Sequence, residues 1–219
     1  VRAAASRLAP AGKGGTGAAS HGHLDAGASV YEAGGIRWFH DLGKDDYNMP
    51  GYFGKQRWDY FRLTNLSHNT LVIDGKLQAT PYTGCPIKEG EVDAVFREAD
   101  IDLTAAYAGQ AEKVIRAAIW NPQTGKVLIA DQIEKPVGPI RWAVVTKAKP
   151  KIEGGRMILE QTGKRLVMTR TDRLGGEWEE FSLKPPTERE QQNEGFHLIG
   201  FTVTPASDKV SIGVAWELE

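Results

Sequence analysis

The chain has 219 residues, 27 Lys and Arg against 28 Asp and Glu, and 41% apolar residues. This length is enough for one large all-β domain with a buried core. The net charge of -1 excludes a chain-wide basic surface of the kind that holds nucleic acid or an anionic membrane. The single cysteine, Cys85, excludes an intrachain disulfide framework and a zinc–thiolate cluster.

The first part of the chain differs from the rest in composition. Residues 1–20 are rich in Ala and Gly and predict a loosely specified lead-in with room for one strand. Residues 21–219 predict a single domain. The sequence begins at Val1 and has no signal-peptide pattern, and no apolar run reaches the roughly 20 residues that span a bilayer. We interpret the chain as a soluble piece of a longer protein.

From Ser29 onward, short apolar runs alternate with turn residues. Gly34-Gly35 predicts a tight hairpin, and the two apolar runs within 113–134 predict a second hairpin around Asn121-Pro122-Gln123-Thr124-Gly125. Further strands are expected at 140–146, 157–160, 165–169, 178–183, 197–204 and 210–218. This spacing, without a helical stripe of useful length, predicts a large antiparallel β-sandwich. The polar run at 185–195 predicts a long exposed loop.

Histidines and carboxylates gather in the first third of the chain. They are His21, His23, His40 and His68, with Asp25, Asp41, Asp45 and Asp46. Residues two apart in an extended segment share a face, so His21 and His23 are expected to line one cleft. Two imidazoles and one carboxylate are good ligands for zinc and leave one coordination position free.

The strand at 35–43 limits which side chains reach that cleft. Alternation puts Ile36, Trp38 and His40 on one face and Asp41 on the other, so only one of His40 and Asp41 easily faces the cleft. His68 opens the next strand, where side chains reach the rim of a sheet. At this point the choice between His40 and Asp41 stays open.

Three motifs together resemble a known family. SHGHLDAG, WFHDLG and YFRLTNLSHNTLVIDG occur in that order, and they resemble signatures of the C-terminal β-domain of heparinase II/III-like polysaccharide lyases, a group that includes alginate lyases. The resemblance is strong over residues 13–78 and looser in the second hairpin. It implies an all-β sandwich normally preceded by an α/α toroid, which this sequence lacks, with the substrate cleft between the two.

The resemblance also implies roles for single residues. It makes His23, Asp41 and His68 the ligands of a zinc ion. It makes His21 a catalytic residue that faces the cleft, and it matches Tyr60 to a catalytic tyrosine of related alginate lyases. His40 then becomes a packed or solvated neighbour, and Asp25 is a candidate for orienting one of the histidines.

A basic and aromatic segment, KQRWDYFR at 55–62, lies near the same rim. Guanidinium groups bind uronate or sulfate in bidentate fashion, which makes Arg57 and Arg62 candidate substrate-binding residues. Tyr52 is a third candidate there and a rival of Tyr60 for the tyrosine position. The opposing interpretation is a set of ordinary core aromatics and solvated arginines.

The implied activity is β-elimination at C4 of a uronic acid. A base removes the C5 proton, and positive donors offset the charge that builds on the carboxylate. The resemblance puts the main Tyr and His pair in the missing helical part, so we expect the isolated fragment to be inactive. Zinc is expected to organise the cleft wall, because elimination needs no water nucleophile.

The expected partners are an acidic polysaccharide or oligosaccharide, the protein's own N-terminal α-helical domain and a possible second copy in a homodimer, without nucleic acid. The resemblance implies a periplasmic or secreted setting. Two alternatives remain open. One is a noncatalytic carbohydrate-binding or structural β-domain, and the other is a cupin-like metal oxygenase with two His and one carboxylate. A phosphate loop at GKGGTGAAS lacks both the Lys-Ser/Thr ending and a following helix.

Overall fold

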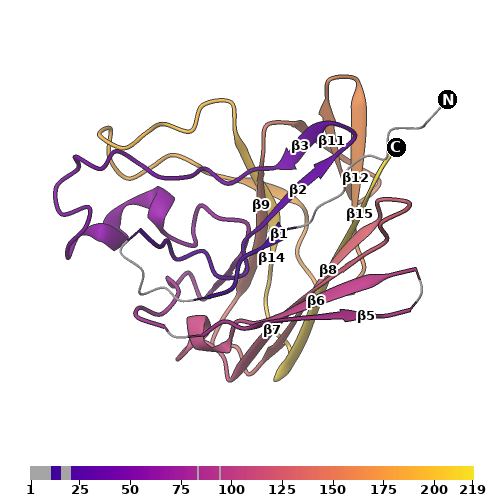
Figure 1. Cartoon of the computed structure of the whole chain (residues 1–219), viewed down its shortest axis with the longest axis horizontal. Helices are drawn as coiled ribbons and strands as arrows, with labels where there is room; N and C mark the ends of the chain where they lie inside the picture. The colour runs from indigo at the N-terminus through magenta and orange to yellow at the C-terminus, as the bar shows by residue number, and fades with distance from the viewer. Residues whose placement is uncertain (1–10, 16–20, 83, 94) are drawn as a thin grey trace.

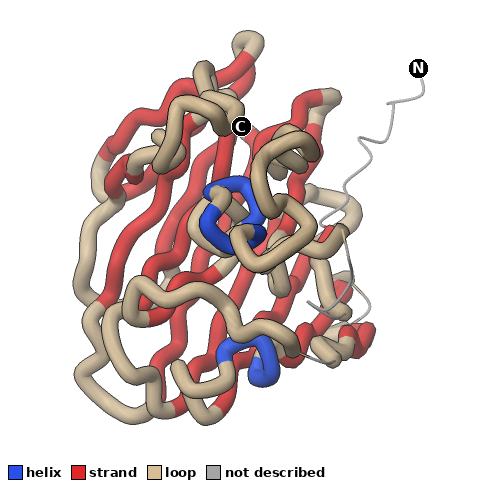
Figure 2. The backbone as a smooth tube through the Cα atoms, turned by 90° about the vertical axis from the view of Figure 1, so that its left-hand side faces the viewer, coloured by secondary structure: helices blue, strands red, loops and turns tan. Residues whose placement is uncertain are grey.

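The fold is antiparallel and nearly all β. A computed structural model describes residues 11–15, 21–82, 84–93 and 95–219. Within these residues the helical elements are three short 3-10 turns, η1 (Arg57–Asp59), η2 (Phe61–Leu63) and η3 (Thr104–Tyr107). Figure 2 shows strands, joined by loops and turns, running through the scaffold. The all-β prediction is confirmed.

The larger of the two main sheets has eight strands within the described residues. Its order is β10-β11-β12-β15-β8-β7-β6-β5, and every neighbouring pair is antiparallel. The strands are β5 (Ile87–Glu91), β6 (Arg97–Asp102), β7 (Lys113–Trp120), β8 (Val127–Glu134), β10 (Lys149–Glu153), β11 (Arg156–Gln161), β12 (Lys164–Arg170) and β15 (Lys209–Leu218).

A four-stranded sheet lies against it, in the order β13-β14-β9-β4. Its strands are β4 (Leu71–Ile73), β9 (Ile140–Thr146), β13 (Glu179–Phe181) and β14 (His197–Val203). A small sheet of β1 (Ala11–Gly12), β2 (Ser29–Ala33) and β3 (Ile36–Phe39) adjoins it, because His40, just after β3, forms a bridge with Val145 of β9. Figure 1 shows this arrangement.

The core follows the period of two that strands impose. Along β9, Ile140, Trp142 and Val144 join a main core shared with the eight-stranded sheet. The intervening Ala143 and Val145 pack in a second cluster on the other face. Strand β9 is therefore buried on both faces, which explains its continuous apolar run from 142 to 145.

The segment 185–195 is a loop that is exposed over most of its length, as its polar sequence predicts, but Pro185, Glu190 and Asn193 in it are buried. Glu190 is 2% exposed, and its carboxylate accepts hydrogen bonds from the backbone N–H of Phe61 at 2.7 Å and from Thr187. Asn193 is also buried and accepts a hydrogen bond from Arg62 at 2.9 Å. Glu190 and Asn193 anchor the exposed loop, because their side chains bind backbone and side-chain groups of the segment before β4.

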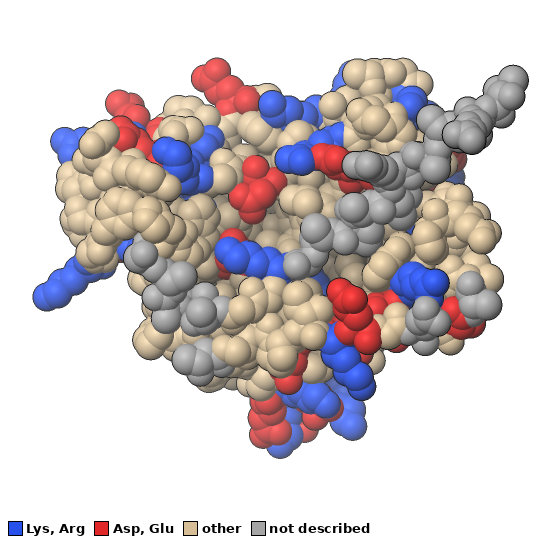
Figure 3. Space-filling model, viewed as in Figure 1, with Lys and Arg blue, Asp and Glu red and all other residues tan. Residues whose placement is uncertain are grey.

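The surface has no broad region of one charge on the face that Figure 3 shows, where acidic and basic side chains are interspersed. Across the described part of the chain, no helix has the length and apolar character needed to cross a bilayer.

Candidate metal centre

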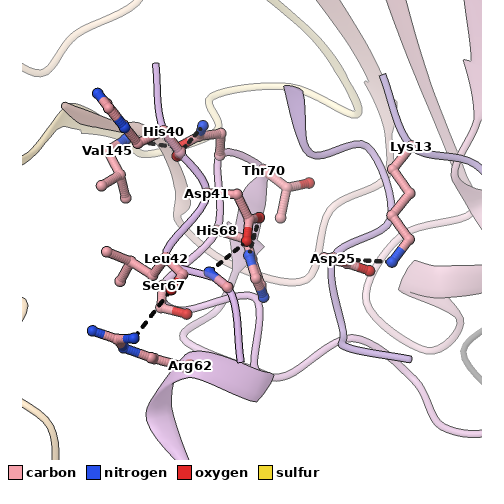
Figure 4. A network of polar contacts seen from close by, with 12 residues as sticks. Lys13, Asp25, His40, Asp41, Leu42, Arg62, Ser67, His68, Thr70 and Val145 are labelled. Carbon is pink, nitrogen blue, oxygen red and sulfur yellow. Dashed lines mark hydrogen bonds and ion pairs between the residues drawn. The ribbon is translucent and has the colours of Figure 1, made fainter. Parts of the chain in front are cut away.

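Three loops meet at one edge of the small sheet and the four-stranded sheet. One loop, residues 21–28, leads into β2, the second follows β3 at His40, and the third, 66–70, leads into β4. Gly27 has a φ of 78°, and a Cβ there would lie 2.6 Å from a methyl carbon of Leu103. The first loop therefore needs glycine at this position. Figure 4 shows Asp41 and His68 turned toward one another, with Asp25 pointing to Lys13.

His68 is the most deeply buried of these side chains, at 0% exposure. Its Nδ1 lies 2.8 Å from Oδ2 of Asp41. A carboxylate can only accept, so Nδ1–H donates and a neutral His68 keeps its lone pair on Nε2. That Nε2 atom is buried and has no hydrogen-bond partner among the described residues. An unpaired buried acceptor of this kind is suited to a metal ion.

His23 and Asp25 lie on the other side of His68. The rings of His23 and His68 are 5.3 Å apart between centroids. One ligand atom from each of His23, Asp25 and His68 lies within 4.8 Å of the others. Oδ1 of Asp25 is buried without a partner among the described residues, while Oδ2 forms an ion pair with Lys13 at 2.6 Å. Two imidazoles with two nearby carboxylates fit the donor set that zinc prefers.

The protonation states of the site also suit a cation. Burial, followed by the nearby His68, lowers the pKa of His23 to about 3, so its imidazole is neutral at pH 7. Burial opposes ionisation of Asp41, but its hydrogen bond and charge interaction with His68 outweigh burial and lower the pKa of that carboxyl. Neutral imidazole and ionised carboxylate are the forms that bind metal.

An open pocket of about 360 Å³ lies over this centre. Its lining includes His21, His23, Asp25 and Asp41, together with Lys13. His21 is exposed and sits with its ring centroid 5.2 Å from Phe53 and 5.7 Å from Tyr47. This exposed imidazole in the pocket lining is accessible to a molecule bound there.

The two tyrosines predicted near the cleft are buried. Tyr52 is 2% exposed, and its hydroxyl accepts a hydrogen bond from the backbone N–H of Asp45 at 3.3 Å. Tyr60 is 9% exposed and donates to the backbone oxygen of Pro50. The two rings are stacked in a small hydrophobic cluster with Leu63. Neither tyrosine is among the residues that line the pocket.

The two predicted substrate-binding arginines are also buried. Arg57 donates to the backbone oxygens of Tyr52 at 2.9 Å and Gly22 at 2.7 Å, so it holds the loop between the two histidines of the HGH motif. Arg62 donates to the backbone oxygen of Leu42 and to side chains of the 185–195 segment. Burial lowers the pKa of each guanidinium from its usual value. Arg57 and Arg62 therefore hold backbone segments of these loops in place.

Sequence reasoning missed Lys13 in the pocket lining and a buried ion pair, Arg116 with Asp131. Lys13 belongs to the lead-in, where nothing in GKGGTG indicates that its amine meets Asp25. Arg116 and Asp131 lie opposite each other in the hairpin of β7 and β8. Their signal is present in the sequence, as one charged residue within each of two apolar runs.

This architecture and site define a class. The chain is a β-sandwich domain with a histidine- and carboxylate-lined pocket at one sheet edge. The family profile described as "Heparinase II/III-like, C-terminal" matches residues 6–210. The chain therefore belongs to the heparinase II/III-like C-terminal domain family.

Solved structures share the fold. The heparan sulfate lyase HepC from Pedobacter heparinus, in a mutant form, is similar with a TM-score of 0.69 and 11% identity, covering 90% of this chain and 30% of its own. A heparinase III, the BT4657 gene product, has a TM-score of 0.68 and 14% identity with the same coverage. The chain thus spans about a third of the length of these structures. No curated protein sequence matches the chain.

Proposed function

We propose that this chain is the C-terminal domain of a polysaccharide lyase that cleaves a uronic-acid-containing polysaccharide by β-elimination. It forms one wall of the substrate cleft, and its own N-terminal α-helical domain forms the other. Membership of the heparinase II/III-like family and the pocket bearing His21 support this proposal. A periplasmic or secreted setting, where such polymers occur, and a possible homodimer belong to the same proposal.

The residues of this chain supply some of the groups that the elimination needs. A base takes the C5 proton, the electron pair forms the C4–C5 double bond, and the glycosidic oxygen leaves C4 with a proton from an acid. His21 is the exposed imidazole of the pocket and is proposed to exchange one of these protons. Lys13, on the same pocket wall, offers positive charge near the sugar carboxylate.

Tyr60, Tyr52, Arg57 and Arg62 remain proposals as cleft residues. Each needs a rearrangement of its buried contacts to reach a sugar, since all four are at most 9% exposed. Arg57 is the best placed of them, because it already bonds Gly22 between His21 and His23. A shift of Arg57 would therefore move the loop that carries His21 and His23.

The centre behind the pocket is proposed to hold Zn²⁺ through His23, Asp41 and His68. The neutral state of His23 and the closeness of Asp41 to His68 support this set, which requires Nδ1 of His68 to lose the proton that it donates to Asp41. Zinc bound there would tie the three loops together and so keep the cleft wall in shape. The ion is structural in this proposal.

A second ligand set has its own support. The unpaired Nε2 of His68 and the unpaired Oδ1 of Asp25 fit an ion held by His23, Asp25 and His68, with Asp41 orienting His68 through Nδ1. The two sets differ in the nitrogen of His68 that binds the ion. Nδ1 binds in the first set, and Nε2 binds in the second.

Cadmium-113 substitution distinguishes these sets. In the ¹⁵N-labelled chain, coupling of the metal to Nδ1 of His68 supports Asp41 as ligand, and coupling to Nε2 supports Asp25. Metal content of Asp25→Asn and Asp41→Asn gives an independent check, because loss of the ligand costs more affinity than loss of the orienting partner. A chain that binds no zinc in competition with a chelator would refute the metal proposal.

The lyase proposal is tested on the full-length protein. The unsaturated product absorbs ultraviolet light, so its formation is followed by absorbance. Heparan sulfate, alginate and hyaluronan are tested as separate substrates. We expect turnover of one of them by the whole protein and none by residues 1–219 alone. Oligosaccharide binding without turnover by the whole protein would instead support the noncatalytic carbohydrate-binding alternative.

A further inference from the structure

A buried ion pair lies beneath the loops of the metal centre. Arg116 of β7 and Asp131 of β8 are 3% and 0% exposed and lie opposite each other in the register of the hairpin. Nε of Arg116 donates to Oδ1 of Asp131 at 2.7 Å, and Nη2 donates to Oδ2 at 2.9 Å. This bidentate contact fixes the plane of the guanidinium.

The remaining terminal nitrogen points away from the pair and bonds two loops at once. Nη1 of Arg116 donates to the backbone oxygen of Gly27 at 2.7 Å and to that of Asn69 at 3.0 Å. Gly27 lies two residues after Asp25, and Asn69 directly follows His68. One rigid side chain of the large sheet therefore contacts both loops that carry the candidate ligands.

Other contacts fix these loops less directly to the scaffold. Gln78 accepts from the N–H and donates to the oxygen of Ala26, and Thr70 donates to the same oxygen at 2.7 Å. These bonds join the loops to each other and to the turn after β4. Arg116 is the contact that ties both loops to the eight-stranded sheet.

The chemistry of the pair favours a positioning role over a stabilising one. Desolvating a buried ion pair consumes most of what its attraction provides, so apolar residues of similar volume often serve stability equally well. A planar guanidinium held by a bidentate carboxylate instead sets two carbonyl oxygens at defined places. An ion pair at this point is therefore explained by a need to hold the backbone oxygens of Gly27 and Asn69 in fixed positions.

We propose that Arg116, held by Asp131, is a positioning residue that sets the separation of the two ligand-bearing loops and so the affinity of the centre for its ion. The proposal rests on the metal site of the proposed function. It acts on the backbone at Gly27 and Asn69 and touches no substrate.

The main test replaces the pair with apolar residues in Arg116→Met/Asp131→Leu. The matched control is Arg170→Met/Asp172→Leu, because Arg170 forms a similar pair with Asp172 and donates to backbone oxygens of a loop, 174–176, that carries no candidate ligand. Zinc affinity is measured by competition with a chelator, and folding is checked by circular dichroism. We expect the first variant to bind zinc about 10- to 100-fold more weakly and the control to match the wild type.

A second measurement needs no metal. Amide hydrogen exchange of the metal-free protein is expected to speed up in 24–28 and 66–70 of the first variant, while the strands β7 and β8 stay protected. Arg116→Lys serves where the double variant does not fold, since its single ammonium keeps the charge but cannot contact Asp131 and both carbonyls together.

The outcomes separate the two proposals. A wild type without zinc affinity overturns the metal proposal, and the exchange data then still decide whether Arg116 positions the loops. Wild-type zinc affinity together with unchanged exchange in both loops of the Arg116 variants overturns the positioning role. Equal losses in the variant and the Arg170 control would also overturn it, because they would show a general loss of stability.

Discussion

Asn69 offers the sharpest test of how the candidate metal centre is built. Its side chain is 2% exposed and makes three hydrogen bonds to backbone groups. Nδ2 donates to the oxygens of Ser29 at 2.6 Å and His40 at 2.8 Å, and Oδ1 accepts from the N–H of Val145 at 2.6 Å. One amide thereby joins β9 to the start of β2 and to the end of β3. Asn69→Leu keeps the size of the side chain and removes all three bonds.

The expected loss of unfolding free energy follows from the backbone groups that lose their hydrogen-bond partner. Val145 is fully buried, so its unpaired N–H costs about 2 to 3 kcal/mol. Ser29 and His40 are half-buried and can recover water, so each lost bond there costs about 0.5 to 1 kcal/mol. The sum is about 3 to 5 kcal/mol, a large part of the roughly 5 to 15 kcal/mol of a typical domain. A domain of this size would then melt about 6 to 20 °C lower.

Urea unfolding of the chelator-treated protein measures this loss, with Asn48→Leu as the control because Asn48 is exposed and bonds only its neighbour Asp46 among the described contacts. Asn69→Asp gives a second signature. Its carboxylate would face two carbonyl oxygens, so folding raises its pKa, and its stability relative to the wild type falls as pH rises. A loss below about 1 kcal/mol for Asn69→Leu would refute this account of the site.

Three further changes test other parts of the structure. Gly200→Ala would place a methyl group 1.9 Å from a backbone oxygen of β9, so we expect a loss of at least about 3 kcal/mol in urea unfolding. Gly90→Ala has open space around its Cβ and should stay within about 1 kcal/mol, and similar losses for both would contradict the packing argument. For His23, the folded pKa of about 3 lies below the usual 6.5 of an imidazole, so the unfolded chain binds more protons between those values. The metal-free protein should therefore lose about 1.4 kcal/mol per pH unit on acidification through this window, and His23→Gln should lack that component in unfolding measured at several pH values. His21→Ala should keep the zinc affinity of the wild type in chelator competition while the full-length protein loses lyase activity, and lost zinc affinity would place His21 among the ligands.

The strands that the sequence predicted are those with apolar alternation or an unbroken apolar run. Strand β9 occupies 140–146 as expected, and both predicted hairpins form. Strands β5, β6 and β10 were missed. β6 has the sequence READID with a half-buried pattern, and β10 contains Pro150 at the edge of the sheet, so neither has a clear apolar face. These strands are held in place by hydrogen bonds to neighbouring strands, and sequence patterns do not reveal which strands pair.

The site shows the same limit. The HGH spacing placed His21 and His23 on one face, and the family resemblance predicted that His23, Asp41 and His68 lie close together. In the structure His68 contacts Asp41 and the ring of His23. The composition of 55–62 also suggested binding groups, but composition does not say which way an arginine points. Arg57 and Arg62 turn inward to backbone oxygens that only the folded loops provide.

The distribution of buried polar groups argues that the loops are built for a ligand. A β-sandwich needs apolar inward positions for stability, and each buried polar group has to recover its lost hydration. Here Arg116, Asp131, Asn69, Gln78 and Thr70 are buried together, and their hydrogen bonds converge on the loops at 24–29 and 66–71. Within the part of the chain that the structure describes, those bonds leave Oδ1 of Asp25 and Nε2 of His68 without a partner. A network that satisfies the backbone around these two side-chain atoms, and not the atoms themselves, supports the proposed cation site.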